Sequence, residues 1–345
     1  MRKNEKNNVK SKFGPMKIIG PILVIIVALL FMTGLRILFS WIIPIKLTAD
    51  ENEKALSVEG SNWMSGISDE SLLSGITIPG THDSATENIV FPYSFSCQNT
   101  SVGRQLTDGY RFFDLRCRVR ESDGAKKVVL YHGSADCHVE KSLNSEALSL
   151  SEVCRECYDF LSQNPSECVI LMLTERDSAE DDIDTFKNTL YGEINENSCY
   201  WYTDNRIPTI GEARGKIVLL LRNEIDGFSE GIVISFSGED MEYCDRGAVS
   251  CEGRFLYQDE SSLSVSKKWE AFCKMLEENE PDDESLCLNY LSCSSGFLGL
   301  PSPKENARRL NDRLMQYPLQ NKDYGVILVD FADEQLAKKI YSANF

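Results

Sequence analysis

Histidine is scarce in this chain, and two of its three histidines stand where catalytic residues are expected. His82 and Asp83 come shortly after the apolar run Gly75–Pro79, and His132 follows Val128–Tyr131. In barrels and open sheets of parallel strands, the carboxyl ends of the strands converge on one face, and active sites lie there. A single histidine is more often structural, but this shared placement, with an aspartate available to each, favours catalysis.

Other apolar runs carry or precede charged residues of the same kind, namely Asp114, Arg116, Arg222 and Asp330. A neutral imidazole accepts a proton from an attacking hydroxyl, and a protonated one supplies a proton to the leaving oxygen. A carboxylate orients each imidazole and supports its charged form. An arginine engages two phosphate oxygens at once and matches their developing negative charge. The set therefore suits phosphoryl transfer without a metal.

Some residues of these types have a plainer interpretation. His138, close to Cys137 and Glu140, is interpreted as a structural or surface histidine. Strand alternation puts Asp114, Arg116 and Arg118 on one side of their strand, with Arg111 near its start. For one member of this arginine trio, a solvated strand face or an ion pair at the bottom of the barrel is the alternative.

The elements that must position these residues are short and strongly apolar. Continuous runs of Val, Ile and Leu fit buried parallel strands. Eight such runs with helices between them predict an α/β fold, a distorted TIM-type barrel. Glu121–Gly124 reads as a hairpin turn, which makes the barrel irregular there. The predicted helices cover residues 148–163, 178–190, 262–279 and 303–316, and the predicted strands are Gly75–Pro79, Tyr110–Val119, Val128–Tyr131, Cys168–Leu173, Lys216–Leu221, Gly231–Phe236, Leu286–Leu291 and Tyr324–Val329.

Charge is distributed unevenly along the 345 residues. Residues 1–46 carry net +7, which leaves −24 of the total −17 for the remainder. An acidic body of this kind argues against a nucleic-acid partner and is not attracted to anionic lipid.

The N-terminal segment predicts a membrane anchor. Ile18–Leu35 is an uncharged stretch of 18 residues, and basic residues precede it. A run of this length spans a bilayer core, and its flanking charges favour a cytoplasmic N-terminus with the catalytic domain outside the cytoplasm. A cleaved signal peptide is the alternative. The expected divisions are a cytoplasmic tail at 1–17, a transmembrane helix at 18–46, a linker at 47–68 and a catalytic barrel at 69–345.

All 12 cysteines lie beyond that segment, between Cys97 and Cys293. An even number in an exported domain favours disulfides. Buried free thiols that pack as small apolar groups are the alternative. Cys154 and Cys157 form a C-x-x-C pair without a second pair at zinc-site spacing, so a structural zinc is disfavoured.

Several of these segments together resemble one family. In chain order they are Ile78–Ser84, Arg111–Arg118, Leu130–Gly133, Asn164–Glu167, Ala213–Leu220, Leu291–Gly296 and Val329–Asp330. They resemble the X domain of the phosphatidylinositol-specific phospholipases C, in its bacterial form. The resemblance implies a TIM-type barrel that cleaves phosphatidylinositol in a bilayer to diacylglycerol and a 1,2-cyclic inositol phosphate.

The same resemblance implies roles for individual residues. His82 is the general base on the inositol 2-hydroxyl, with Asp330 as its carboxylate partner. His132 is the general acid toward the diacylglycerol oxygen, assisted by Asp83. Arg116 contacts the phosphate.

Relatives that need calcium have a carboxylate where this chain has Arg116, so no metal and no cofactor are expected, and Asp114 is interpreted as an anchor for Arg116. Arg222 matches an inositol-binding arginine. The family lysine after the fourth strand is replaced by Thr174 or Glu175, and an acid there accepts hydrogen bonds from inositol hydroxyls. Asp240 and Tyr243 are the candidates for two further inositol contacts.

Apolar residues near the expected barrel rim suit shallow contact with a bilayer. They are Phe91, Tyr93 and Phe95 in one loop and Phe297, Leu298 and Leu300 in another, with packing beneath the loops as the alternative. Two other functions stay open. One is a glycerophosphodiester phosphodiesterase, which the Asp83 that follows His82 disfavours. The other is a barrel that binds inositol lipids without cleaving them.

Overall fold

We describe a computed structural model of the chain, which divides into two units, Met1–Pro44 and Ile45–Phe345. The structure describes residues 25–32, 34–35, 59–122, 124–142, 144–175, 182–234, 249–252, 255–278, 285–294 and 302–345.

The predicted membrane anchor was wrong. Of the predicted anchor 18–46, the structure describes residues 25–32 and 34–35, which are helical. The other residues of the segment are not among those described. No helix among the described residues is both long enough and apolar enough to cross a bilayer, a task that takes about 20 apolar residues. The placement of an anchored catalytic domain outside the cytoplasm rested on that helix and is corrected with it.

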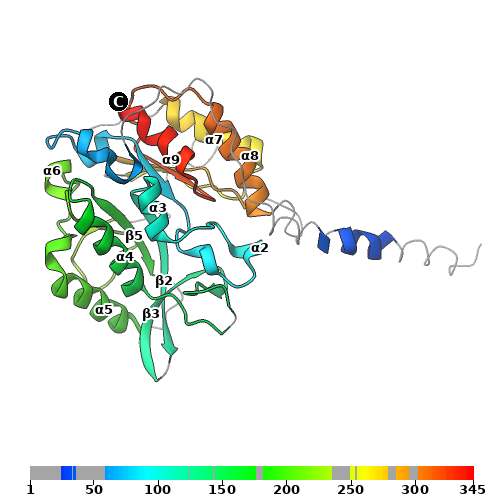
Figure 1. Cartoon of the computed structure of the whole chain (residues 1–345), viewed down its shortest axis with the longest axis horizontal. Coiled ribbons are helices and arrows are strands. Elements are labelled where there is room, and N and C mark those ends of the chain that lie inside the picture. Colours follow the sequence, from blue (N-terminus) through cyan, green and yellow to red (C-terminus); the bar gives the residue numbers. More distant parts are fainter. Residues whose placement is uncertain are drawn as a thin grey trace, which may run out of the picture. The chain divides into compact units, whose positions relative to one another are not determined.

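A single curled sheet forms the centre of the second unit (Figure 1). Its parallel core runs in the spatial order β7, β5, β2, β1, β12, β11, β10. These strands are β1 (Ile78–Thr81), β2 (Phe112–Ser122), β5 (Val169–Glu175), β7 (Ile217–Leu221), β10 (Phe255–Gln258), β11 (Leu286–Tyr290) and β12 (Val326–Val329).

Short strands complete the two edges of this sheet. Beside β7 lie β6 (Trp201–Tyr202) and β8 (Ile232–Val233), both parallel to it. At the other edge β9 (Val249–Glu252) pairs antiparallel with β10. Over the described residues the sheet is thus a curled half-barrel, which agrees with the predicted α/β class and with an irregular TIM-type barrel.

The hairpin predicted after the second strand is present. Strand β3 (Ala125–His132) pairs antiparallel with β2, and β4 (Ala135–Asp136) continues from it. Gly124 has φ 76°, a left-handed conformation that glycine adopts without steric cost. Figure 1 shows this hairpin extending away from the sheet. Strand β3 runs back alongside β2, with Leu130 opposite Cys117. The end of β3 therefore places His132 beside the middle of β2.

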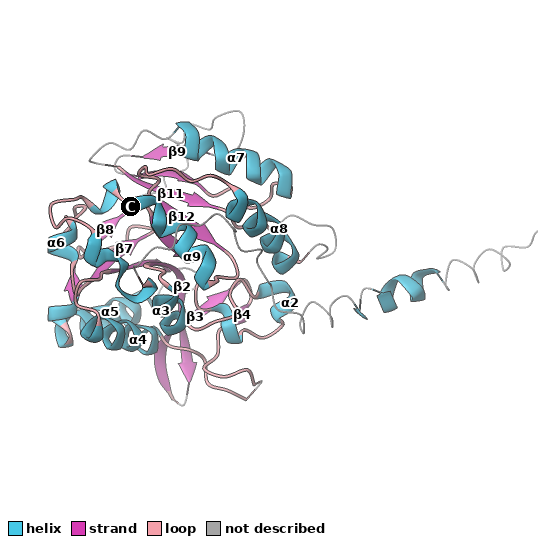
Figure 2. Cartoon of the chain, turned by 45° about the horizontal axis from the view of Figure 1, so that its top comes forward, coloured by secondary structure: helices cyan, strands magenta, loops and turns pink. Residues whose placement is uncertain are grey.

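The four predicted helices are present, three of them within three residues of the predicted ends, while the second lies at 183–196 instead of 178–190. They are α4 (Leu150–Gln163), α5 (Ile183–Glu196), α7 (Val265–Glu278) and α8 (Pro303–Gln316). Ser149 with Glu152 and Ser302 with Glu305 form capping boxes that start α4 and α8, each satisfying two exposed donors at the helix start. Four further helices of the second unit, α2 (Pro92–Phe95), α3 (Val102–Asp108), α6 (Ile210–Ala213) and α9 (Glu334–Tyr341), were not predicted. Figure 2 shows the helices packed around the strands.

The amino end of the parallel sheet is closed by a buried ion pair. Arg111 Nη2 lies 2.7 Å from Glu167 Oε2, and both side chains are fully buried. The guanidinium also contacts the rings of Phe160 and Trp63. Of the three arginines Arg111, Arg116 and Arg118, Arg111 is thus the one that forms an ion pair at the bottom of the barrel. Trp63 belongs to the short helix Gly60–Gly66, so the packed body already includes part of the expected linker.

The disulfide prediction was wrong for the cysteines that the structure describes as free thiols, which are Cys97, Cys117, Cys137, Cys154, Cys157, Cys168, Cys199 and Cys273. Cys154 and Cys157 occupy the buried face of α4, and Cys117 lies within β2. Six of the eight thiols, all but Cys199 and Cys273, are buried as small apolar groups, which was the alternative interpretation.

Candidate active site

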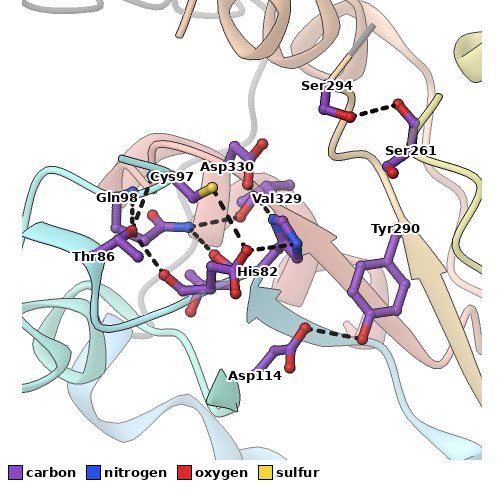
Figure 3. A network of polar contacts seen from close by, with 12 residues as sticks. His82, Thr86, Cys97, Gln98, Asp114, Ser261, Tyr290, Ser294, Val329 and Asp330 are labelled. Carbon is purple, nitrogen blue, oxygen red and sulfur yellow. Dashed lines mark hydrogen bonds and ion pairs between the residues drawn. The ribbon is translucent and has the colours of Figure 1, made fainter. Parts of the chain in front are cut away.

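Strand register brings His82 and Asp330 together. Strands β1 and β12 are parallel neighbours in which Thr81 lies opposite Val329, so the next residue of each strand lies at the same level. His82 Nδ1 is 2.8 Å from Asp330 Oδ1 (Figure 3). Both side chains are nearly buried, which strengthens the contact. Because an ionised carboxylate only accepts, Nδ1 carries the proton and Nε2 faces the site.

Gln98 fixes this pair from behind. Its Nε2 donates to the backbone oxygens of His82 at 2.9 Å and Val329 at 3.0 Å. Its Oε1 accepts from the backbone N–H of Ala332 at 2.9 Å. One fully buried amide therefore ties together the ends of β1 and β12, from which the base and its partner project.

Asp83 stands at the centre of the site. Its Oδ2 lies 3.0 Å from His82 Nε2 and 3.1 Å from His132 Nε2, and its Oδ1 lies 2.8 Å from Arg116 Nε. Its backbone has φ 42°, in the left-handed region that aspartate tolerates better than most residues. A strained residue held in this way is typical of functional sites. Its carboxylate links the base, the acid and the arginine.

His132 is held through its other nitrogen. Nδ1 lies 2.7 Å from the backbone oxygen of Phe95, and since a carbonyl only accepts, Nδ1 is the donor. The Phe95 ring meets the imidazole edge to face at 6.1 Å. Like His82, His132 therefore directs Nε2 inward.

A cavity of about 380 Å³ is bordered by His82, Arg116, His132 and Asp330. Its wall includes the ends of several strands, with Thr174 after β5, Arg222 after β7 and Asp259 after β10. Arg222 Nη2 pairs with Asp259 Oδ2 at 2.5 Å. Further lining residues are Ser94, Phe95, Cys97, Gly133, Ser261, Ser292, Cys293, Ser294 and Pro303. A wall of hydroxyls and charged side chains suits a ligand rich in hydroxyl groups.

The charges in the site shift one another's pKa values. Burial lowers the pKa of His82, but the carboxylates of Asp83 and Asp330 outweigh burial and hold it well above its usual value. Burial also acts to raise the pKa of Asp83, yet His82, His132 and Arg116 together hold it far below its usual range. The Asp83 carboxylate raises the pKa of Arg116. Titratable groups whose pKa values are strongly shifted by specific charged partners are typical of catalytic sites.

The structure brings His82, Arg116, His132, Asp330 and Arg222 together around one cavity, and the buried Asp83 contacts three of them, His82, Arg116 and His132. His138 lies elsewhere, with Nδ1 2.9 Å from the backbone oxygen of Ser145.

The other sequence candidates for substrate contact are placed differently. Asp114 is fully buried and accepts a hydrogen bond from Tyr290 Oη at 3.2 Å, while the carboxylate that contacts Arg116 is that of Asp83. Thr174 borders the cavity, and Glu175, which points to the opposite face of the strand, does not belong to its lining. Asp240 and Tyr243 lie outside the described residues.

Three residues of the site were missed from sequence. Asp259 follows β10, whose apolar run Phe-Leu-Tyr is too short to be read from sequence as a buried strand. Cys97 and Gln98 lie in an irregular segment after the short helix α2 (Pro92–Phe95), where no periodic pattern exists. Asp259 could have been found by the argument applied to Asp330, since each is an aspartate directly after a strand.

Comparison with known proteins confirms the family resemblance. Residues 81–223 match the family described as Phosphatidylinositol-specific phospholipase C, X domain. A protein named 1-phosphatidylinositol phosphodiesterase from Listeria monocytogenes is 28% identical over 304 residues, covering 84% of this chain and 86% of the relative. A protein of the same name from Staphylococcus aureus is 24% identical over 295 residues, covering 81% of this chain and 90% of the relative.

Solved structures agree on the fold. The phosphatidylinositol-specific phospholipase C from Listeria monocytogenes superposes with a TM-score of 0.65 at 27% identity, covering 84% of this chain and all of that one. A phosphatidylinositol-specific phospholipase C structure from S. aureus gives a TM-score of 0.68 at 23% identity, covering 82% of this chain and 97% of that one.

Proposed function

We propose that this chain, which carries the X domain of the phosphatidylinositol-specific phospholipases C, is a phosphatidylinositol-specific phospholipase C. It cleaves the bond between glycerol and phosphate, releasing diacylglycerol and a 1,2-cyclic inositol phosphate. The observation that carries the proposal is the convergence of His82 Nε2 and His132 Nε2 on one point beside Arg116, at 3.0 and 3.1 Å from Asp83 Oδ2.

His82 takes the proton of the inositol 2-hydroxyl. Asp330 holds its Nδ1–H and stabilises the imidazolium that forms. Because the resting pKa of His82 is raised, the neutral base becomes more abundant as pH rises through that pKa. The 2-oxygen then attacks phosphorus, and the geometry in which the base is locked supplies the orientation.

His132 donates a proton to the departing diacylglycerol oxygen. The Phe95 carbonyl keeps its Nδ1–H in place, and Asp83 supports the protonated ring from the side of Nε2. For His132 to protonate the leaving oxygen, its Nε2 must leave Asp83 and face the substrate. The contact between Asp83 and His132 Nε2 therefore belongs to the site without substrate. Arg116, whose Nε is 2.8 Å from Asp83 Oδ1, neutralises the charge that develops on the non-bridging phosphate oxygens.

Headgroup binding is assigned to the polar wall of the cavity. Arg222 donates to inositol hydroxyls and Asp259 accepts from them, and the ion pair between the two side chains keeps both in place. Thr174 is 3% exposed, and its Oγ1 has no protein partner among the described residues, which leaves it able to bond an inositol hydroxyl. Glu175 stays a prediction as an inositol contact.

Among the residues that the structure describes, one exposed aromatic side chain stands beside the cavity. Phe91, with 71% of its surface exposed, stands immediately before α2, whose Ser94 and Phe95 border the cavity. Tyr93 and Phe95 are partly buried, and Phe297, Leu298 and Leu300 lie outside the described residues. We assign Phe91 to shallow contact with the bilayer that presents the substrate.

The roles of the two histidines can be separated by leaving group. Phosphatidylinositol is compared with an inositol phosphate ester of nitrophenol, which leaves without protonation. His132→Ala should lower the rate on phosphatidylinositol by roughly 10²–10⁴-fold and the rate on the nitrophenyl ester only slightly. His82→Ala should lower both rates by a similar large factor. Equal losses for His132→Ala on the two substrates would remove its role as acid.

A further inference from the structure

One buried group beside the histidines has no part in the proton transfers. Cys97 is 2% exposed and belongs to the cavity wall. Its Sγ lies 3.8 Å from Asp83 Oδ2 and 3.8 Å from His132 Nδ1. It is also within 4.8 Å of donor atoms of His82 and Asp330. A sulfur donor therefore joins two imidazoles and two carboxylates at one place.

Both imidazoles are oriented as metal ligands usually are. A ligating histidine typically donates its second ring N–H to a carboxylate or a backbone carbonyl, which fixes the tautomer and raises the basicity of the ligating nitrogen. His82 Nδ1 has Asp330 as that partner at 2.8 Å, and His132 Nδ1 has the Phe95 carbonyl at 2.7 Å. The two Nε2 atoms are left to share Asp83 Oδ2.

The separations measured from Asp83 Oδ2 come near those of a tetrahedral ion, and Cys97 Sγ approaches His132 on the Nδ1 side of its ring. Zinc holds sulfur at about 2.3 Å and nitrogen or oxygen at about 2.0–2.2 Å, so tetrahedral ligand atoms lie roughly 3.3–3.6 Å apart. The separations here are 3.0 and 3.1 Å from Asp83 Oδ2 to the two Nε2 atoms and 3.8 Å to Cys97 Sγ. We propose that Zn²⁺, or another thiophilic divalent cation of its class, binds between Cys97, His82, His132 and Asp83 and blocks the active site.

The charges of the site accommodate such an ion. The carboxylates of Asp83 and Asp330 stand beside the ring nitrogens, and one guanidinium, that of Arg116, pairs with Asp83, so negative groups that a divalent cation needs are already in place. The thiol loses its proton to solvent as the metal binds. Mg²⁺ and Ca²⁺ prefer oxygen ligands and gain little from a sulfur and two nitrogens. Selectivity for Zn²⁺ over Ca²⁺ therefore follows from the donor set.

Inhibition follows from which atoms the ion would occupy. The lone pairs on His82 Nε2 and His132 Nε2 are those that the proposed mechanism uses for proton transfer, and a metal-bound imidazole neither accepts nor donates a proton there. The blocking effect thus rests on the proposed phospholipase function, whereas binding of the ion does not. A chelator should reverse the inhibition, because the ion is held only by coordination to protein side chains and can be removed.

Binding is tested on the full-length protein with Co²⁺, a spectroscopic substitute for Zn²⁺. Co²⁺ bound by a thiolate absorbs through sulfur-to-metal charge transfer in the near ultraviolet, and added Zn²⁺ removes the band by displacement. We expect the band in the unaltered protein and in Cys293→Ser, a cysteine variant in the same cavity wall, and its loss in Cys97→Ser and Cys97→Ala. Absence of the band in the unaltered protein, or its persistence in folded Cys97 variants, would overturn the site.

The second arm measures activity on phosphatidylinositol vesicles during titration with Zn²⁺ or Ca²⁺. Each variant is compared with its own uninhibited rate. Half-inhibition of Cys97→Ser should need at least about tenfold more Zn²⁺ than that of Cys293→Ser, since loss of even an outer partner weakens metal binding 10–100-fold. Equal sensitivity of the two would contradict the proposal. A cobalt band in a protein without phospholipase activity would retain the metal site and refute the proposed function.

Discussion

Replacing Asp330 by asparagine isolates the charge that supports the proposed base. Asp330 is 3% exposed, and its Oδ1 lies 2.8 Å from His82 Nδ1. Asparagine has nearly the same shape and can still accept the Nδ1–H bond, so the tautomer of His82 is retained. What the substitution removes is the negative charge opposite the imidazolium that forms as the 2-hydroxyl is deprotonated.

The expected size of the effect follows from two opposing quantities. Unit charges about 4 Å apart, the separation of charge centres in such a pair, attract by about 4 kcal/mol at an effective dielectric constant near 20. The hydrogen bond that asparagine keeps to a charged donor retains about 2 kcal/mol of this. The remaining loss of about 2 kcal/mol corresponds to a fall in kcat of roughly 30-fold.

The pH profile gives an independent measure of the same charge. Asp83 and Asp330 hold the pKa of His82 well above its usual value. The base works only when neutral, so activity rises with pH through that pKa. In Asp330→Asn the pKa of His82 falls, and the acid limb of kcat/KM moves to lower pH even as the plateau drops.

The assay is release of inositol phosphate from phosphatidylinositol between pH 5 and 9. The matched control is Asp333→Asn, which removes a negative charge three residues away where the side chain caps α9 and accepts from the Gln335 N–H. Asparagine caps helices about as well as aspartate, so stability should hold. An unmoved acid limb in Asp330→Asn, or a fall in kcat as small as that of the control, would refute the assignment.

Three further perturbations test other parts of the account. Gln98→Leu breaks the bonds that tie β1 to β12 and should lower kcat about 10- to 100-fold with little change in KM; an equal rise in KM would argue against a positioning role. Phe91→Ser should reduce vesicle binding and vesicle hydrolysis but spare hydrolysis of a soluble short-chain substrate. Glu167→Gln leaves the Arg111 guanidinium buried without its counter-charge and should lower the free energy of unfolding in urea by roughly 3–5 kcal/mol. A loss under 1 kcal/mol would contradict that estimate.

The parts of the fold that sequence could predict are those with a strong local pattern. Val169–Glu175 and Ile217–Leu221 are fully apolar runs apart from the end of the first, and both are buried parallel strands. The ranges predicted for α4 and α8 lie within two residues of the observed helices, and a capping box begins each helix. The hairpin after β2 was readable because Gly124 supplies the turn conformation.

The site could be predicted only where a reactive residue follows such a strand. His82, His132 and Asp330 met that condition, but their mutual distances depend on register, which only the assembled sheet determines. Adjacent residues also proved less separable than the sequence suggested. Asp83, assigned by resemblance to His132 alone, contacts both histidines through one carboxylate oxygen.

Composition misled the prediction in two places. An uncharged N-terminal run suggested a membrane helix, and the even number of cysteines in a body assumed to be exported suggested disulfides. Thiols such as Cys154 and Cys157 instead fill core positions on α4. Their pattern along the sequence is the same in either case, since an apolar thiol and a bonded half-cystine are both buried.

The most direct test of the central claim is to assay the full-length protein on phosphatidylinositol vesicles with excess EDTA present and to identify the water-soluble product. With Arg116 as the positive charge at the phosphate, the account predicts sustained turnover and a 1,2-cyclic inositol phosphate as the first product. Turnover that stops in EDTA and returns on addition of calcium, or a first product that is never cyclic, would contradict it.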